Sequence, residues 1–129
     1  MIAVDTSAIV AVLWGEAEEN RIRAVLMDAG GALISSGNLL ELQLVLAGSR
    51  SPIGWQQAEA LLKQYAISMS PFNDVQLDIA REAAIRYGKG RHGARLNFGD
   101  CFAYALAKSE DIPLLCTGGD FAKTDVALA

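Results

Sequence analysis

Short apolar runs alternate with longer segments of mixed polarity along the chain. Four of these runs have the length of strands. The first, Ile2–Val4, is apolar at every position, which is typical of a strand buried on both faces. The other three predicted strands are Ala32–Ser35, Ile67–Met69 and Pro113–Cys116.

The segments between these runs place apolar residues at helical spacing. We expect helices from Thr6 or Ser7 to Trp14, Glu16 to Asp28, Ser36 or Asn38 to Gly48, Pro52 to Tyr65, Asn73 or Asp74 past Ala84, and Phe98 or Gly99 to Lys108 or Ser109. Strands that alternate with helices favour an α/β fold, in which a short, mostly parallel sheet is flanked by helices. Ligands of such sheets bind beyond the carboxyl ends of the strands.

The chain has 129 residues, of which 52% are apolar, and we expect one globular domain spanning residues 1–129. No apolar stretch reaches the roughly 18 residues of a membrane span, and the N-terminus lacks the basic segment of a signal peptide. Cys101 and Cys116 lie in apolar segments, as expected for free thiols. We therefore expect a cytoplasmic protein.

The net charge of −4 argues against a surface that is basic throughout and binds nucleic acid by charge alone. Basic residues nevertheless gather in one stretch, which also holds the only histidine, His92. This stretch contains Arg81, Arg86, Lys89, Arg91 and Arg95. It predicts a local basic patch, although a solvated basic loop would have the same composition.

Four carboxylates stand at the edges of apolar segments: Asp5, Glu41, Asp100 and Asp120. Stripping a charge of water costs several kcal/mol unless another group compensates it. A shared divalent cation would do so, and hard oxygen ligands favour Mg²⁺ or Mn²⁺. Such an ion can lower the pKa of a bound water and neutralise charge on a phosphoryl group.

Each acid also has a purely structural interpretation. Asp5 and Asp120 can cap the segments that follow them, and Asp100 can interact with the dipole of its helix. The helix around Glu41 is apolar almost all round, which predicts that it is buried, but a narrow exposed stripe would also accommodate Glu41.

Taken together, four segments resemble the acidic motifs of PIN-domain nucleases, in order and spacing along nearly the whole chain. Within that superfamily the chain is most similar to the VapC-type toxins of bacterial type II toxin–antitoxin pairs. The segments are Val4-Asp5-Thr6-Ser7-Ala8, Leu39-Leu40-Glu41, Leu96 to Ala107 around Asp100, and Thr117-Gly118-Gly119-Asp120-Phe121.

The resemblance implies a three-layer PIN-like domain that acts as an endoribonuclease dependent on Mg²⁺ or Mn²⁺. By motif position, Asp5, Glu41, Asp100 and Asp120 become the metal-binding catalytic acids, and Ser7 and Thr117 become supporting hydroxyls. Members of the family cut structured RNA, often transfer RNA, many as homodimers, and a small antitoxin blocks the site. Many members carry Asn or Asp directly before the last acid, where this chain has Gly119, so we rank Asp120 below the other three acids.

Other interpretations of the sequence are weaker or remain open. Gly88-Lys89-Gly90-Arg91-His92-Gly93 fits a dinucleotide-binding pattern but follows a helix rather than a strand. No nucleophile elbow accompanies His92, which argues against a Ser-His-Asp hydrolase. We interpret Lys89, Arg91, His92 and Arg95 as contacts to RNA phosphates. The alternative to an active nuclease is a catalytically idle PIN-like module that binds RNA or a protein.

Overall fold

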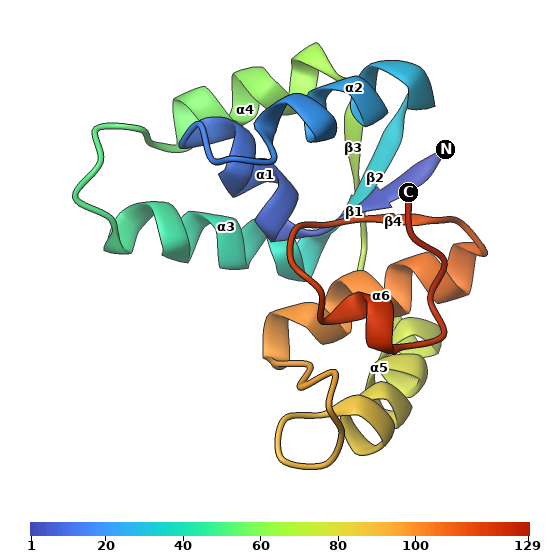
Figure 1. Ribbon diagram of the computed structural model, residues 1–129. Helices are drawn as coiled ribbons and strands as arrows, with labels where there is room; N and C mark the ends of the chain where they lie inside the picture. Colours follow the sequence, from blue (N-terminus) through green and yellow to red (C-terminus); the bar gives the residue numbers. More distant parts are fainter.

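The computed structural model describes residues 1–129 and contains a four-stranded parallel sheet with helices on both faces (Figure 1). The strands lie in the order β3–β2–β1–β4, and every neighbouring pair is parallel. The elements are β1 (Ile2–Val4), α1 (Thr6–Leu13), α2 (Glu19–Ala29), β2 (Ala32–Ser35), α3 (Ser36–Gly48), α4 (Trp55–Gln64), β3 (Ile67–Ser70), α5 (Asp74–Tyr87), α6 (Phe98–Glu110), β4 (Leu114–Leu115) and the 3-10 helix η1 (Phe121–Lys123). The predicted α/β class and all four predicted strands are confirmed.

Side chains of the sheet alternate between two apolar cores. Ile2 and Val4 of β1 face the core formed with α1, α2, α3 and α4, whereas Ala3 faces the core formed with α5 and α6. Leu115 and Leu114 of β4 divide between the two cores in the same way. Both faces of the sheet are therefore covered at β1 and β4, which explains why β1 carries no polar side chain, whereas Ser68 and Met69 of the edge strand β3 are exposed.

The order of the strands reverses beside β1. The chain proceeds from β1 to β2 and β3 on one side and returns through α6 to β4 on the other. A crevice outside the carboxyl ends of the strands forms at such a reversal in open α/β sheets, and it is the usual ligand site. Asp5 directly follows β1, and Cys116 and Thr117 directly follow β4, so both chain segments arrive at this crevice.

Two predicted helix starts are wrong, each by three residues. α2 begins at Glu19 rather than Glu16, and α4 begins at Trp55 rather than Pro52. At α4 the backbone N–H of Gly54 donates to Oε1 of Gln57 at 2.8 Å, so this pair forms the start of the helix. α2 ends at Ala29, one residue past the predicted Asp28, and the following Gly30 adopts the left-handed conformation with φ 65° that commonly ends a helix.

The prediction that the leucine-rich helix is buried is also wrong. Leu42 and Leu46 of α3 are buried in the core, but Leu40 is 63% exposed and Leu44 is 65% exposed. α3 therefore packs on the core through Leu42, Leu46 and the half-buried Leu39, and it presents Leu40 and Leu44 to solvent.

No helix combines the length and the apolar character needed to cross a membrane. Both cysteines are free thiols, Cys116 buried and Cys101 half-buried. Burial raises the pKa of both thiols, that of Cys116 to about 11, which keeps them protonated near neutral pH.

Candidate functional site

An acidic cavity of about 300 Å³ lies at the crevice between β1 and β4. We call it the acidic cavity because three of the four predicted acids line it, one from each of three elements: Asp5 before α1, Glu41 on α3 and Asp100 on α6. The two predicted hydroxyl residues, Ser7 and Thr117, line it too. Residues from both ends of the chain thus meet at the site that the sheet topology indicates.

Asp5 caps α1 and faces the acidic cavity at the same time. Its Oδ2 accepts a hydrogen bond from the backbone N–H of Ser7 at 3.0 Å, while its Oδ1 is buried and has no hydrogen-bond partner. Burial raises the pKa of the Asp5 carboxyl to about 6; the hydrogen bond from Ser7 opposes this rise, and the charges of Asp100 and Glu41 add to it.

Glu41 is held in place by Asn38, a fully buried residue that the sequence analysis did not single out. The side-chain amide of Asn38 donates to Oε1 of Glu41 at 3.2 Å and to the carbonyl of Gly99 at 3.0 Å. The hydroxyl of Thr6 donates in turn to the carbonyl of Asn38 at 3.2 Å. The sequence could have indicated this contact, because Asn38 precedes Glu41 by three positions, and residues with that spacing lie on the same face of a helix.

Gly99 allows α3 and α6 to approach each other beside the site. A Cβ atom at this position would overlap the carboxylate of Glu41, so no side chain fits there while Glu41 keeps its place. Gly99 therefore contributes space rather than chemistry to the acidic cavity.

Asp100 forms a capping box with Asn97 at the start of α6. The backbone N–H of Asp100 donates to Oδ1 of Asn97 at 2.9 Å, and Oδ2 of Asp100 accepts from the backbone N–H of Asn97 at 3.0 Å. Partial burial raises the pKa of the Asp100 carboxyl; the hydrogen bond from Asn97 opposes this, and the charges of Glu41 and Asp120 reinforce the rise. Asp100 therefore stabilises its helix and contributes negative charge to the cavity.

The turn after β4 is connected to α1 and α2. The backbone N–H of Thr117 donates to Oγ of Ser7 at 3.1 Å. Arg21 donates to the carbonyl of Cys116 at 2.7 Å, and the N–H of Gly118 donates to Oε2 of Glu18 at 3.3 Å. Arg21 and Glu18 themselves form an ion pair at 2.9 Å on the surface.

Asp120 lies apart from the other acids. It is exposed, it is not among the residues lining the acidic cavity, and its side chain makes no capping hydrogen bond to η1. Its negative charge nevertheless helps to raise the pKa of the Asp100 carboxyl. In its place the cavity includes Glu16, an exposed acid that the sequence analysis did not single out.

With the side chains as they stand, no three His, Cys, Asp or Glu residues are close enough together to hold one metal ion. The acidic cavity nevertheless fits a hydrated Mg²⁺ ion, since Mg²⁺ keeps several waters and needs only one or two carboxylates. Asp5 supplies a buried oxygen without a partner, and Glu41 and Asp100 add negative charge that a cation would neutralise.

The four predicted substrate-binding residues lie together on the loop between α5 and α6. Lys89, Arg91, His92 and Arg95 line an open cavity of about 530 Å³ that contains no acid. This cavity is separate from the acidic one. The imidazole Nδ1 of His92 accepts a hydrogen bond from the N–H of Ala94 at 2.9 Å, which orients its ring. The glycine-rich pattern follows helix α5, so it has the context of a surface loop rather than of a dinucleotide site.

The comparison with known proteins assigns the class. The PIN domain family model matches residues 2–127, so the chain belongs to the PIN-domain family. Ribonuclease VapC30 of Mycobacterium tuberculosis is 40% identical over 126 residues, which cover 98% of this chain and 96% of that protein. Ribonuclease VapC of Mycolicibacterium smegmatis is 38% identical over 126 residues, with 98% of each chain covered. The family match therefore extends to proteins named VapC ribonucleases.

Solved structures agree on the fold. Mycobacterium tuberculosis VapC20, described as a sarcin-ricin loop cleaving toxin, aligns with a TM-score of 0.79 at 18% identity, covering 100% of this chain and 98% of that one. The VapBC2 complex of Rickettsia felis, bound to a DNA fragment from its promoter, aligns with a TM-score of 0.71 at 16% identity and covers 100% of this chain and 98% of the matched one. At these identities the likeness concerns the fold alone.

Proposed function

We propose that this protein is the ribonuclease toxin of a toxin–antitoxin pair, acting as a single domain over residues 1–129. Its relatives at about 40% identity are named VapC ribonucleases. The finer proposal is an endoribonuclease that depends on Mg²⁺ or Mn²⁺ and hydrolyses phosphodiester bonds of structured RNA such as transfer RNA.

One observation supports this function more than any other: Asp5, Glu41 and Asp100 line the same cavity at the strand ends, and Asp5 keeps a buried oxygen unpartnered. Bringing these three carboxylates together opposes the stability that Asp5 and Asp100 contribute as helix caps, because like charges repel and burial disfavours ionisation. A bound cation would turn the same features into a favourable site.

We assign the roles residue by residue. Asp5, Glu41 and Asp100 would hold the metal, with Asp120 assisting from the rim. When bound, the metal would activate a water for attack and neutralise charge on the phosphate. Ser7 and Thr117 would supply supporting hydroxyls near the metal, and the hydrogen bond from the backbone N–H of Thr117 to Oγ of Ser7 joins the two strand ends. Asn38 orients Glu41, and Lys89, Arg91, His92 and Arg95 would contact RNA phosphates.

Because water rather than the ribose 2′-OH is the nucleophile, no cyclic phosphate should form. We expect the P–O3′ bond to break, so that the 3′ oxygen leaves as a hydroxyl and the other product carries a 5′-phosphate. A 2′,3′-cyclic phosphate at the cleaved end would contradict this mechanism.

A cognate antitoxin is the expected protein partner, and a homodimer is the expected assembly. The solved structures of similar fold include toxin–antitoxin complexes from Klebsiella pneumoniae and Rickettsia felis. A basic side chain of the antitoxin that enters the acidic cavity would block it by charge complementarity.

The test is cleavage of a transfer-RNA pool by the purified, antitoxin-free protein in Mg²⁺ or Mn²⁺. We expect discrete fragments that disappear in EDTA and with Asp100→Asn, which keeps an oxygen acceptor for the capping box. Asp28→Asn, at an exposed position on α2, is the matched control and should cleave like the parent.

A second candidate is an idle PIN-like module, and the exposed position of Asp120 after Gly119 favours it. Folded protein that binds RNA but leaves the pool uncut in either metal would support this candidate and contradict the nuclease.

A further inference from the structure

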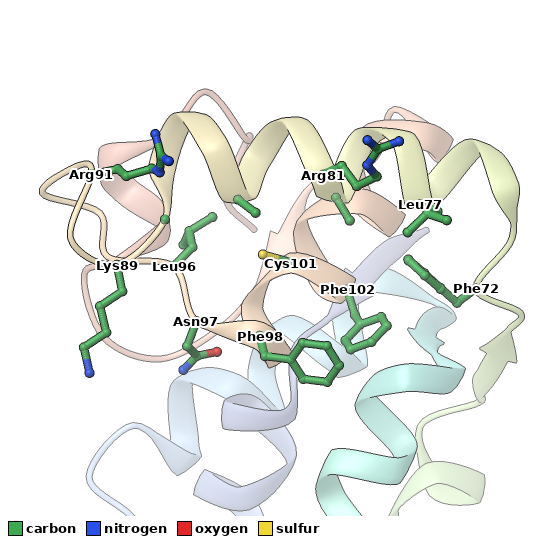
Figure 2. Close-up of a pocket in the computed structure, with 13 residues that line it drawn as sticks. Phe72, Leu77, Arg81, Lys89, Arg91, Leu96, Asn97, Phe98, Cys101 and Phe102 are labelled. Carbon is green, nitrogen blue, oxygen red and sulfur yellow. The ribbon is translucent and has the colours of Figure 1, made fainter.

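A third cavity, lined mainly by apolar side chains, lies between α5 and the start of α6 (Figure 2). Its volume is about 550 Å³, within the range of roughly 300–1,000 Å³ typical of small-molecule sites. We call it the aromatic pocket because Phe72, Phe98 and Phe102 contribute to its lining. Nothing in the catalytic roles assigned above uses it.

The three rings form a row that ends in solvent. Phe102 meets Phe72 edge-on with ring centroids 4.7 Å apart, and Phe98 edge-on with centroids 5.0 Å apart. Phe98 is 83% exposed, the highest value among the exposed large hydrophobic residues of the chain. An exposed aromatic side chain beside a cavity leaves a ring face available to a ligand, and exposed apolar patches commonly mark interaction sites.

The charged residues around the aromatic pocket are all basic. Arg81, Lys89 and Arg91 are part of its lining and no acid is, although the chain as a whole carries a net charge of −4. Figure 2 shows Lys89 and Arg91 at one end of the pocket and Arg81 toward the other. Lys89 and Arg91 also line the open cavity of the basic loop, so cationic side chains continue from one cavity to the other.

The aromatic pocket also adjoins the acidic cavity. Asn97 lines both, and Phe98 precedes Asp100 by two residues in the first turn of α6. A ligand could therefore occupy the aromatic pocket while the adjoining part of the same molecule lies at the carboxylates.

We propose that the aromatic pocket binds an unpaired nucleotide of the RNA substrate, with its base stacked on Phe98 and neighbouring phosphates contacting Lys89 and Arg91. The inference rests on the proposed nuclease function and adds to it a site for recognising single-stranded RNA. Proteins bind unpaired bases by stacking them on aromatic rings while basic side chains follow the backbone.

Charge complementarity favours a nucleic acid over a protein partner here. Arg81 lies 4.0 Å from Asp78 on its own helix, so it does not depend on a ligand for an acidic partner. An apolar helix of a protein would leave Lys89 and Arg91 without acidic partners unless it supplied its own, whereas each nucleotide of RNA brings an apolar ring and an anion together. The arrangement also predicts cleavage in loops rather than within duplexes, because bases inside a helix are not free to enter the pocket.

The test measures binding of a short oligoadenylate, labelled with fluorescein, by fluorescence anisotropy in Mg²⁺. Asp100→Asn serves as the background so that the RNA is bound without being cut. Adding Phe98→Ala should weaken binding about tenfold, since stacking of one base is worth roughly 1–3 kcal/mol. Phe98→Trp should retain binding and Phe98→Leu should not, because leucine is apolar but has no aromatic face.

Two controls separate this site from general effects. Met27→Ala, at a position 74% exposed on α2, removes a comparable exposed side chain and should leave binding unchanged. Arg91→Ala should reduce the slope of log affinity against log salt by about 0.7, the value for one phosphate contact in a single strand.

The inference is overturned if Phe98→Ala binds oligoadenylate as tightly as its background, or if that background binds none. It is also overturned if Phe98→Leu binds normally, or if Phe98→Ala instead converts a dimer to a monomer by sedimentation, since the pocket would then be a protein interface. Cleavage of transfer RNA by the otherwise unaltered Phe98→Ala protein with unchanged KM would leave the nuclease standing without this pocket. If the parent protein does not cleave RNA with either metal but the Phe98 variants bind oligoadenylate as expected, the pocket is supported and the nuclease function is contradicted.

Discussion

Neutralising Asp5 should stabilise the metal-free protein at neutral pH while abolishing cleavage. Asp5 is 4% exposed, and its pKa rises from the ordinary 3.8 to about 6. A rise of one unit corresponds to about 1.36 kcal/mol, so the ionised carboxylate destabilises the folded state by about 3 kcal/mol relative to the protonated one. Asp5→Asn removes this charge in an otherwise similar side chain.

The sign of the pH dependence follows from proton binding. The folded protein binds the Asp5 proton more tightly than the unfolded chain does, so the contribution of Asp5 to stability is greatest below about pH 4 and is lost as the pH rises through about 6. The stability difference between Asp5→Asn and the parent should therefore grow by about 2 kcal/mol between about pH 4.5 and about pH 7.5. Any constant cost of burying the new amide is the same at both values and cancels.

Urea unfolding in EDTA, followed by circular dichroism at both pH values, measures this difference. The exposed Asp28→Asn variant provides the matched control, and its stability difference from the parent should stay nearly constant. A difference for Asp5→Asn that is equally constant would refute the reasoning, because it would mean that Asp5 is not ionised with a net penalty in the folded state.

Three further predictions concern the same cavity. Mg²⁺ at a hundredfold excess over its Kd should stabilise the parent at neutral pH by about 2.7 kcal/mol and should not stabilise Asp5→Asn; urea unfolding measures both values. Equal stabilisation of the two proteins would mean that the metal binds elsewhere. Gly99→Ala should reduce cleavage at least tenfold by displacing Glu41. In the control Gly48→Ala, a Cβ meets nothing within 4 Å, so this variant should keep its activity, and its free energy of unfolding should rise by about 0.5–1 kcal/mol. Equal activity of the two variants would show that the close approach at Gly99 is unimportant. Asn38→Ala should lower the free energy of unfolding by about 1–3 kcal/mol, because the buried carbonyl of Gly99 loses its hydrogen-bond donor. It should also reduce kcat, because Glu41 loses the amide that orients it. An unchanged kcat would show that Asn38 does not position Glu41 for cleavage.

The sequence was sufficient for the elements whose signals are local. β1 is apolar at every position, and a helix stop such as Gly30 acts through its own backbone conformation. The placement of Asp5 was predictable for the same reason, because a residue directly after a strand of a parallel sheet lies at the ligand-binding edge.

Features that depend on distant packing were not predictable. Leu40 and Leu44 look the same in sequence as Leu42 and Leu46, and only the position of α3 in the fold decides which pair is exposed. The start of α4 was misjudged because Pro52 is suited to a first helical turn, but the pairing of Gly54 with Gln57 lies further along the chain.

The same limit applied to the site. Asn38 connects α3 to the carbonyl of Gly99 on α6, a contact between residues 61 positions apart that no local pattern reveals. The separation of Asp120 from the acidic cavity likewise depends on how the turn after β4 is held. Gly119 gave a hint of this difference, though not of its geometry.

The contacts that hold Asp5 and Glu41 differ in kind from those that hold the turn after β4. Asp5 accepts a hydrogen bond from the backbone of Ser7, and Glu41 accepts one from the buried amide of Asn38; salt scarcely affects such contacts. The segment leading to Asp120 is held by the hydrogen bond from Thr117 to Ser7 and also through Glu18 and Arg21, an exposed ion pair that dissolved salt screens. The inner contacts of the site should therefore tolerate salt, whereas high ionic strength should weaken one attachment of the segment that carries Asp120.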